Sequence, residues 1–245
     1  MDTKNNMSTL PKALFCWSGG KDSSYCLHKV LSEKQFDVVY LMTTVNDAFK
    51  RISMHGVREE LLDKQIESIG IPAIKVRIKD GTHAEYEELM RDTLLRVKAE
   101  GVTHVIFGDI FLEDLRSYRE ENLKKVDLLG VFPLWKMDTK ALIQDFIAKQ
   151  FKTITCCIND GYLEESWVGK EIDTDFVNEL PAFVDPCGEN GEYHTFCYDG
   201  PVFKTPITFT VGEKIYKPLE YQFDDDVCKS PIKTKGFWYC DLISV

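Results

Sequence analysis

The chain is 245 residues long, with 44% hydrophobic residues, 29% charged residues and a formal net charge of −10. This length allows one large domain or two modest ones, and no apolar run approaches the roughly 20 residues that a membrane span needs. The acidic balance and the absence of a dense Lys/Arg cluster argue against a nucleic-acid substrate, because nucleic-acid binders usually present a basic face.

The N-terminal residues and the cysteines indicate the compartment. Residues 1–9 are polar and lack the apolar core of a secretion signal, so we expect a cytoplasmic protein. None of the eight cysteines forms a Cys-x-x-Cys pair, which argues against zinc ribbons, thioredoxin-like redox sites and simple iron–sulfur ligation. In the cytoplasm these cysteines should be reduced and act as small apolar residues.

The first half of the chain alternates predicted strands and helices. Short apolar runs predict strands, and apolar residues at spacings of three and four predict amphipathic helices between them. Gly70 and Gly101 stand where two of these helices should end. In chain order the predicted elements are a strand at 13–17, a helix at 22–31, a strand at 37–43, a helix at 57–69, a strand at 73–78, a helix at 84–99, and strands at 102–107 and 131–134.

This alternation predicts a doubly wound α/β fold, in which a mostly parallel sheet carries helices on both faces. Right-handed crossovers bring the carboxyl ends of parallel strands to one edge, where ligands of such sheets bind. The loops at 18–23, 43–56 and 108–119 should therefore converge on one cleft.

The second half of the chain has a different pattern. Asp138 or Thr139 can cap a helix at 139–149, and the apolar runs that follow predict only short strands, at 152–158, 207–211 and 237–242. We therefore predict two domains, an α/β domain at 10–136 and a smaller α+β domain at 137–245.

The segment Ser18-Gly19-Gly20-Lys21-Asp22-Ser23 lies between the first predicted strand and the first helix. Its glycines can take positive φ, and the free N–H groups and dipole of a helix start attract an anion. Lys21 adds a positive charge, and the serines add hydroxyl donors. Gly-Gly alone is often only a turn, and the Walker A spacing is missing, but the full string in this context predicts a phosphate-binding loop. Asp22 either caps the helix or lies beside a metal ion.

A second group of polar residues, at 108–119, directly follows the strand at 102–107. Asp109 can act on a metal or substrate, and Arg116 and Arg119 can hold a phosphate or carboxylate with two hydrogen bonds. The alternative is a charged helix start with solvated pairs. The position at the predicted ligand-binding edge favours the functional interpretation.

A third group lies between residues 185 and 196. Glu189, Glu192 and His194 are titratable groups within six residues of each other, on a backbone made unusual by two glycines. Such groups can work as acid, base or amine binders. The alternative is a plain acidic turn. His55, in the loop after the strand at 37–43, is either a site residue or an ordinary loop histidine.

These segments occur in an order that resembles a known family. The phosphate-binding loop resembles the pyrophosphate loop of the PP-loop ATP pyrophosphatases, which cleave ATP between the α and β phosphates. Together with the Gly108-Asp109 strand end, Glu165-Ser166-Trp167-Val168-Gly169 and Gly188-Glu189-Asn190-Gly191-Glu192-Tyr193-His194-Thr195-Phe196, it resembles the ATP-binding family that contains diphthine–ammonia ligase. The resemblance covers residues 14–203. Position 194 is His here where some relatives carry Glu.

The resemblance implies an adenine nucleotide alpha hydrolase-like fold that binds ATP and Mg²⁺. It implies catalytic roles for Lys21, Asp109, Glu189 and Glu192. It implies nucleotide contacts from Ser18, Gly19, Gly20, Lys21, Asp22, Ser23, Thr43, His55 and Gly108, and a magnesium contact from Asp22.

The reaction that the resemblance implies is ATP-dependent amide formation. A substrate carboxylate attacks the α-phosphate, pyrophosphate leaves, and ammonia then attacks the acyl-adenylate. No glutaminase domain fits in the chain, so free ammonia is the expected nitrogen source. The acceptor is diphthine on elongation factor 2 if the source makes diphthamide, and is otherwise open.

Two other interpretations remain at this stage. The first is a PP-loop enzyme that modifies tRNA, against which the acidic charge and the missing Cys-x-x-Cys argue. The second is an ATP-binding module without catalysis. A membrane partner is not expected, and self-association as a homodimer is compatible with the sequence.

Overall fold

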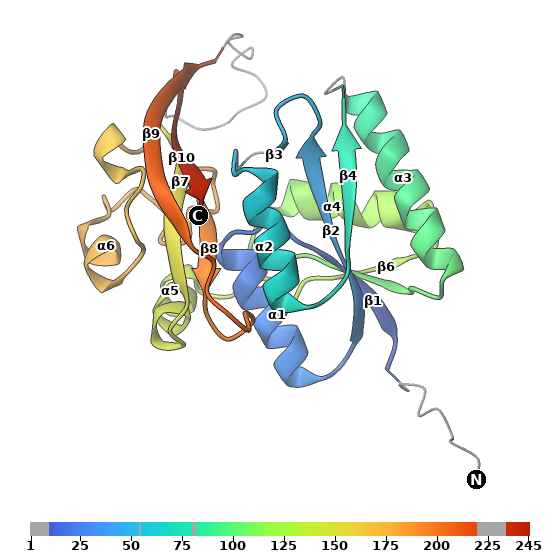
Figure 1. Ribbon diagram of the computed structural model, residues 1–245. Coiled ribbons are helices and arrows are strands. Elements are labelled where there is room, and N and C mark those ends of the chain that lie inside the picture. The colour runs from blue at the N-terminus through green and yellow to red at the C-terminus, as the bar shows by residue number, and fades with distance from the viewer. Residues whose placement is uncertain (1–9, 54, 80–81, 220–233) are drawn as a thin grey trace.

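A computed structural model gives the fold and describes residues 10–53, 55–79, 82–219 and 234–245. The polar N-terminal residues 1–9 and Cys228 lie outside this range. Figure 1 shows two β-sheets with helices packed around them. No helix in the described part of the chain is both long and apolar enough to cross a membrane.

The first sheet is formed by the N-terminal half of the chain. Its parallel strands lie in the order β4-β2-β1-β5-β6, and the short strand β3 pairs antiparallel with the end of β2. The strands are β1 (Lys12–Cys16), β2 (Asp37–Asn46), β3 (Arg51–Ile52), β4 (Ala73–Ile78), β5 (His104–Ile106) and β6 (Leu129–Val131). The helices between them are α1 (Lys21–Glu33), α2 (Glu59–Ile69), α3 (His83–Ala99) and α4 (Glu113–Lys124).

The strand order reverses between β1 and β5. The chain runs outward from β1 through β2 to β4, then crosses back to place β5 on the other side of β1. In open α/β sheets, ligands bind beyond the carboxyl ends of the strands at such a reversal. The residues after β1 and after β5 therefore lie at the position where a ligand is expected.

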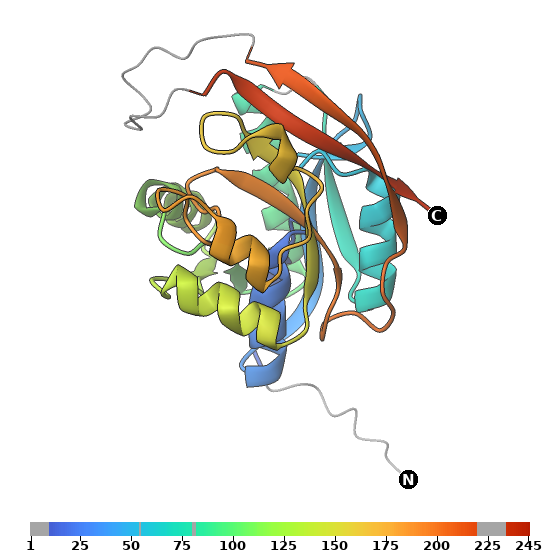
Figure 2. The same cartoon turned by 90° about the vertical axis from the view of Figure 1, so that its left-hand side faces the viewer.

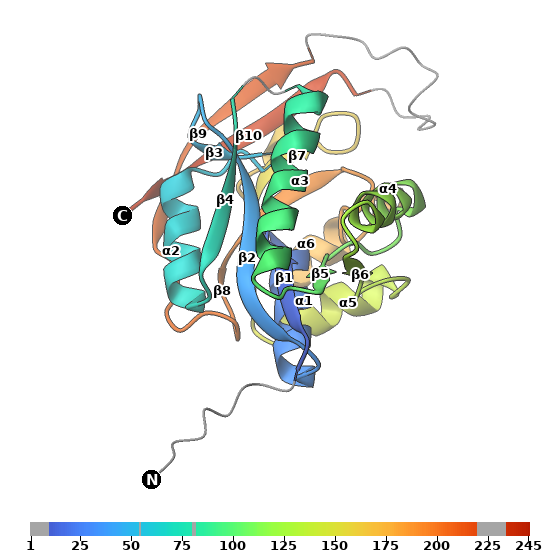
Figure 3. The same ribbon diagram turned by 90° about the vertical axis from the view of Figure 1, so that its right-hand side faces the viewer.

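Alternation along the strands builds a separate core on each face of this sheet. Phe15 joins the core on one face, whereas the preceding residue, Leu14, joins the core on the other. Helices α1 and α2 cover the first face, and α3 and α4 cover the second (Figure 3). The predicted doubly wound, mostly parallel α/β fold is thus confirmed.

The second sheet is antiparallel, with the order β8-β7-β10-β9. Figure 2 shows its long β9–β10 pair crossing one side of the molecule. Its strands are β7 (Lys152–Asn159), β8 (Tyr193–Asp199), β9 (Phe209–Pro218) and β10 (Gly236–Ser244), and the helices of this half are α5 (Thr139–Ala148), the 3₁₀ helix η1 (Glu165–Trp167) and α6 (Thr174–Glu179). Asp138 caps α5 by accepting the Ala141 N–H at 2.8 Å, one of the two predicted caps.

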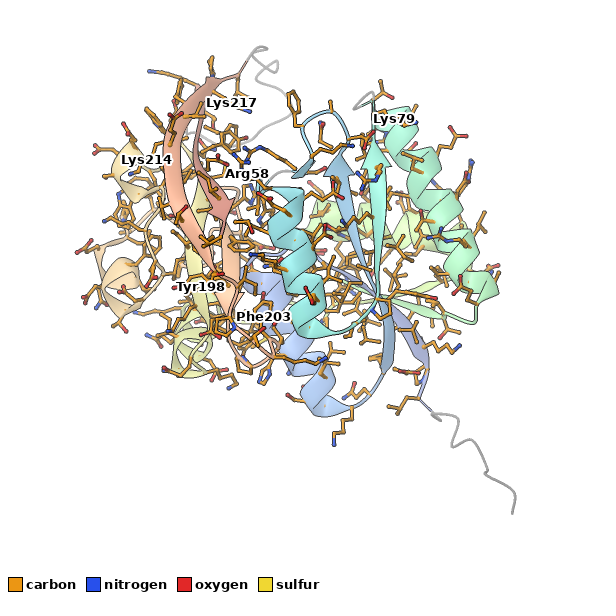
Figure 4. The ribbon with its side chains drawn as sticks, viewed as in Figure 1. Arg58, Lys79, Tyr198, Phe203, Lys214 and Lys217 are labelled. Carbon is orange, nitrogen blue, oxygen red and sulfur yellow. The ribbon has the colours of Figure 1, made fainter. Side chains whose placement is uncertain are left out.

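The two halves pack against each other on the α1–α2 face of the first sheet. One hydrophobic core extends from this face into the second sheet, and Tyr25 of α1 lies 6.2 Å, centroid to centroid, from Phe151. Arg58 before α2 also pairs with Asp241 of β10 at 2.7 Å. Figure 4 shows the Arg58 side chain between α2 and the β9–β10 pair. Because the core is shared, the predicted domain boundary at 136–137 stays a prediction.

Candidate active site

Residues 18–23, the predicted phosphate-binding loop, connect β1 to α1 at the reversal of the strand order. Gly19 has φ +80°, a conformation that L side chains rarely adopt. Gly20 is the N-cap of α1 and has no side chain with which to cap it. The hydroxyl of Thr195 in β8 instead accepts the Lys21 N–H at 3.0 Å. A residue of the C-terminal half therefore caps the helix that follows the loop.

Two further close approaches bring other segments against this loop. A Cβ atom at Gly20 would lie 2.7 Å from the His55 ring and 3.1 Å from the Thr195 carbonyl oxygen. A Cβ atom at Gly108 would lie 3.3 Å from the Asp22 carbonyl oxygen. Residues of the predicted loops at 18–23, 43–56 and 108–119 thus meet, as the parallel order of β1, β2 and β5 predicts.

Hydroxyl groups hold the loop in shape. The Ser18 hydroxyl donates to the Ser23 hydroxyl at 3.1 Å and accepts the Gly20 N–H at 3.3 Å. The Ser23 and Ser24 hydroxyls both donate to the Gly20 carbonyl, at 3.0 and 2.8 Å. A loop with its backbone fixed in advance can bind an anion without losing much further conformational freedom.

Lys21 is buried, with 2% of its surface exposed. Its ammonium contacts both carboxylate oxygens of Asp22, at 2.7 and 2.9 Å, and lies 5.4 Å from the centre of the Tyr193 ring. Burial alone would lower the pKa of Lys21, but the neighbouring Asp22, Cys187 and Glu189 outweigh it, and the pKa lies above its usual value. Lys21 therefore keeps its positive charge beside the loop.

Asp109, directly after β5, is paired with Arg119 of α4. The Arg119 Nε lies 2.7 Å from Oδ2 of Asp109, and Nη2 donates to Oδ1 at 3.1 Å. The Arg119 guanidinium also lies 4.4 Å from the centre of the Phe107 ring. Burial, with a smaller contribution from Asp22, raises the pKa of Asp109 despite the opposing charge of Arg119.

Arg116 was expected, with Arg119, as an anion-binding residue, and the structure gives it other contacts. It pairs with Glu120 at 2.8 Å along α4. Its guanidinium lies 4.7 Å from the Phe132 ring centre and 4.6 Å from that of Trp135. The alternative interpretation, a charged helix start, fits Arg116 better.

Glu189 connects the C-terminal glycine-rich loop to the end of β5. Its Oε1 atom accepts the Ile110 N–H at 2.7 Å and the Phe111 N–H at 3.4 Å. Burial, reinforced by the Asp22 charge, raises the pKa of Glu189 to about 7. This carboxyl group can therefore give and take a proton near neutral pH.

Glu192 is fully buried and is used by its own loop. Its carboxylate accepts the Asp185 N–H at 2.9 Å, the Asn190 N–H at 2.8 Å and the Asn190 side-chain amide at 3.0 Å. Both oxygens are thereby occupied, so the geometry favours a role in shaping the loop.

His55 and His194 face each other beside Gly20, with ring centres 5.0 Å apart. The Nδ1 atom of His55 lies 2.8 Å from the Thr195 carbonyl oxygen, so it carries the proton in the neutral ring. Burial lowers the pKa of His55 below its usual value. Burial, with His55 and Lys21, lowers the pKa of His194 to about 3. Both rings are therefore neutral near pH 7.

Thr43 and Asp22 are the remaining predicted contacts of a nucleotide and its metal. The Thr43 side chain is buried, and its hydroxyl has no hydrogen-bond partner in the described part of the chain. Across those same residues, no three His, Cys, Asp or Glu side chains could hold a metal by themselves. Mg²⁺ usually keeps water and phosphate ligands and takes one or two carboxylates. The 28% exposed side chain of Asp22 could be one of them.

Two family models cover most of the chain. The model described as diphthamide synthase N-terminal domain matches residues 11–128, and the diphthamide synthase C-terminal domain matches residues 138–224. The chain belongs to this diphthine–ammonia ligase-like PP-loop family. The phosphate-binding loop and Asp109 lie in the first match, and Glu189 to Thr195 lie in the second. Residues of both family domains thus meet at the site.

Curated relatives carry the name diphthine–ammonia ligase. The protein from Rattus norvegicus is 26% identical over 222 residues, which cover 81% of this chain and 82% of that protein. The one from Danio rerio is 26% identical over 223 residues and covers 81% and 86%. The relative from Schizosaccharomyces pombe is 25% identical, and its match covers 93% of this chain but 40% of that longer protein.

One solved structure is a distant neighbour of this fold. It is described as a predicted subunit of tRNA methyltransferase from Methanocaldococcus jannaschii, and it matches with a TM-score of 0.41 and 14% identity. The match covers 59% of this chain and 80% of that one. This likeness is too weak to bear on function.

The structure brings most of the predicted site residues of this family member to one edge of the sheet. Sequence reasoning missed Thr195 as a cap, although it lies in the recognised motif, because a cap supplied from another sheet has no local signal. It also missed Gln65 of α2, whose fully buried side-chain amide donates to the Gly19 carbonyl of the loop. A glutamine within the apolar stripe of an amphipathic helix was the available signal.

Proposed function

We propose that this protein is an ATP-dependent ligase that adenylates a carboxylate and converts it to an amide with ammonia. The names of its relatives suggest this activity. One observation carries the proposal for this chain: the phosphate-binding loop is completed by Thr195, from the same motif whose Glu189 contacts the end of β5. A site for phosphates and a second group of titratable side chains therefore adjoin each other.

In the first step, a carboxylate oxygen of the acceptor attacks the α-phosphorus of ATP. The bond from that phosphorus to the bridging oxygen of the β-phosphate breaks, and pyrophosphate leaves with the electron pair. The charge that develops on the leaving group is stabilised by the N–H groups of the loop and by Lys21. Mg²⁺, held by Asp22 and the phosphates, would neutralise part of the same charge. Thr43 and His55 contact the nucleotide beside the loop.

In the second step, ammonia attacks the carbonyl carbon of the acyl-adenylate. A carbon–nitrogen bond forms, the bond from the acyl carbon to the AMP oxygen breaks, and AMP leaves. The nitrogen must then lose one proton to give the neutral amide. Glu189 is suited to accept it, because its pKa lies close to neutral pH. Glu192 takes part indirectly, by holding the loop that carries Glu189.

The names of the relatives suggest the acceptor. We propose diphthine on elongation factor 2 if the source makes diphthamide, and another carboxylate compound if it does not. The reaction takes place in the cytoplasm, where ATP and ammonia are available.

The test is a pyrophosphate-release screen in which ammonia, Mg²⁺ and ATP are combined with candidate carboxylates, including elongation factor 2 that carries diphthine. AMP is measured in parallel. The proposal predicts equal release of AMP and pyrophosphate that depends on the acceptor. Release of ADP and phosphate as the only products would contradict it.

A further inference from the structure

Gln65 lies in the interior of the protein between α2, the phosphate-binding loop and β8. Its side chain is 0% exposed, and both of its polar atoms have hydrogen-bond partners. The Oε1 atom accepts the indole N–H of Trp17 at 3.1 Å. The Nε2 atom donates to the Gly19 carbonyl at 3.0 Å and to the Cys197 carbonyl at 2.6 Å. One buried amide thus connects the loop to two neighbouring elements.

The Gly19 carbonyl oxygen is a hydrogen-bond acceptor shared by Gln65 and β8. It accepts a second hydrogen bond, from the Cys197 N–H of β8 at 2.9 Å. The peptide bond is planar and trans, so the Gly19 carbonyl and the Gly20 N–H point in opposite directions. With the carbonyl fixed toward Gln65 and β8, the Gly20 N–H points to the other side, where it meets the Ser18 hydroxyl.

We propose that Gln65 is a positioning residue that sets which end of the Gly19–Gly20 peptide faces the bound phosphates. This inference rests on the proposed function, because it requires that the loop binds the phosphates of ATP. Gly19 and Gly20 are the two residues of the loop without side chains, so their peptide has the most freedom to turn. Without Gln65, the Cys197 N–H alone would hold the Gly19 carbonyl. The carbonyl could then turn its negative end toward the phosphates, and the anion would be repelled.

A merely structural role for Gln65 makes a different prediction. Gln65 could serve only to fasten α2 to the C-terminal half of the chain. Ser68, about one turn along the same helix, provides that kind of link without contacting the loop. Its hydroxyl donates to the Thr205 carbonyl at 2.6 Å and accepts the Thr205 N–H at 3.0 Å. Ser68→Ala is therefore a matched control.

The experiment compares Gln65→Met, Gln65→Glu and Ser68→Ala with the wild-type protein. Met has similar length and no hydrogen bonds to offer, and Glu keeps an acceptor for Trp17 but loses both donors. Calorimetric titration gives the Kd for Mg²⁺-ATP and for inorganic pyrophosphate, and urea unfolding gives the folded fraction of each variant.

We expect both Gln65 variants to raise the Kd at least about tenfold, the effect of losing one to two hydrogen bonds. The factor should be the same for ATP and for pyrophosphate, because the change acts on the phosphate-binding loop. Ser68→Ala should lower stability but leave both Kd values within about twofold.

Two results would overturn the inference. One is that folded Gln65 variants bind both ligands as tightly as the wild type. The other is that Ser68→Ala weakens binding as much as the Gln65 variants do. Wild-type protein that binds neither ATP nor pyrophosphate would overturn the proposed function, and this inference with it.

Discussion

The Oε1 atom of Glu189 accepts the backbone N–H of Ile110 at 2.7 Å, and this bond joins residues that are 79 positions apart in the chain. It ties the C-terminal motif to the end of β5, at the reversal of the strand order. The Thr195 hydroxyl makes a second such link, to the Lys21 N–H. The predicted phosphate-binding loop and the motif therefore adjoin each other.

Replacement of Lys21 should remove most of the ATP turnover. Lys21→Met keeps the length of the side chain but removes the positive charge beside the loop. We expect turnover to fall by about 100-fold or more, the effect of losing one preorganised charged group in a buried site. AMP release under saturating acceptor measures this change. Lys29→Met is the control, because Lys29 lies on the same helix and pairs with Glu33 near the surface. Equal turnover in the two variants would contradict the role of Lys21.

Glu189→Gln should separate activity from stability. The pKa of Glu189 is raised to about 7 from 4.5, so the folded protein binds this proton more tightly than the unfolded chain does. Stability then falls as pH rises from about 4.5 to 7, because ionisation of the buried carboxyl opposes folding. Glutamine can accept the Ile110 N–H but cannot ionise.

We therefore expect Glu189→Gln to match the wild type in unfolding free energy at pH 4 and to exceed it by about 1 kcal/mol at pH 8. Its rate of amide formation should be lower than that of the wild type. The rate should also no longer rise as the pH is raised through about 7. Urea unfolding at both pH values and a pH–rate profile measure these effects. A variant that is less stable than the wild type at pH 8 would show that the carboxylate is not penalised by burial.

The hydroxyl of Thr195 should contribute both to stability and to ATP affinity. Thr195→Val keeps the shape of the side chain but leaves the Lys21 N–H without its cap, at a cost of about 1 kcal/mol in unfolding free energy. Because the cap fixes the loop, ATP affinity should also fall. Thr195→Ser retains the hydroxyl and should restore both quantities in large part. Identical ATP affinity in the valine and serine variants would contradict this role.

Asp241 should contribute to stability and not to chemistry. It accepts hydrogen bonds from Arg58 at 2.7 and 3.0 Å and from Arg51 at 2.9 Å, which join β10 to the first half of the chain. Its bonds to Arg58 and Arg51 hold the pKa of Asp241 below its usual value of 3.8. This stabilisation is present above about pH 4 and is lost as pH falls through the lower, folded-state pKa.

Asp241→Asn should lower the unfolding free energy at pH 7 by about 1–2 kcal/mol. The difference from the wild type should shrink below pH 4, and the Kd for ATP should be unchanged. Urea unfolding at pH 7 and pH 3, with a calorimetric titration of ATP at pH 7, tests both statements. A loss of ATP affinity would mean that the contact between the halves controls the site.

Local sequence patterns were sufficient for most of the first sheet. Apolar runs and glycine stops gave β1, β2, β4 and the helices between them to within a few residues, because these elements bury one face against a neighbour in the same repeating unit. The pattern failed for β8, whose residues lie in the glycine-rich motif. That segment is a strand because it pairs with β7 and contacts the loop, and neither partner is nearby in sequence.

The second sheet and the finer site geometry depended on such distant contacts. β9 extends over ten residues although most of its side chains are exposed, since its pairing with β10 supplies the backbone hydrogen bonds that its side chains do not predict. Likewise, Glu192 is a titratable candidate from its place in the motif. Only the fold reveals that both of its oxygens are used by its own loop.

The most direct test of adenylation follows oxygen from the acceptor. An acceptor found by the pyrophosphate screen is prepared with ¹⁸O in its carboxylate and incubated with the protein, ATP, Mg²⁺ and ammonia. Mass spectrometry of the products then locates the label. We predict one ¹⁸O atom in the phosphate of each AMP, because the carboxylate oxygen that attacks the α-phosphorus leaves with AMP. Label in inorganic phosphate, together with ADP, would contradict attack at the α-phosphate.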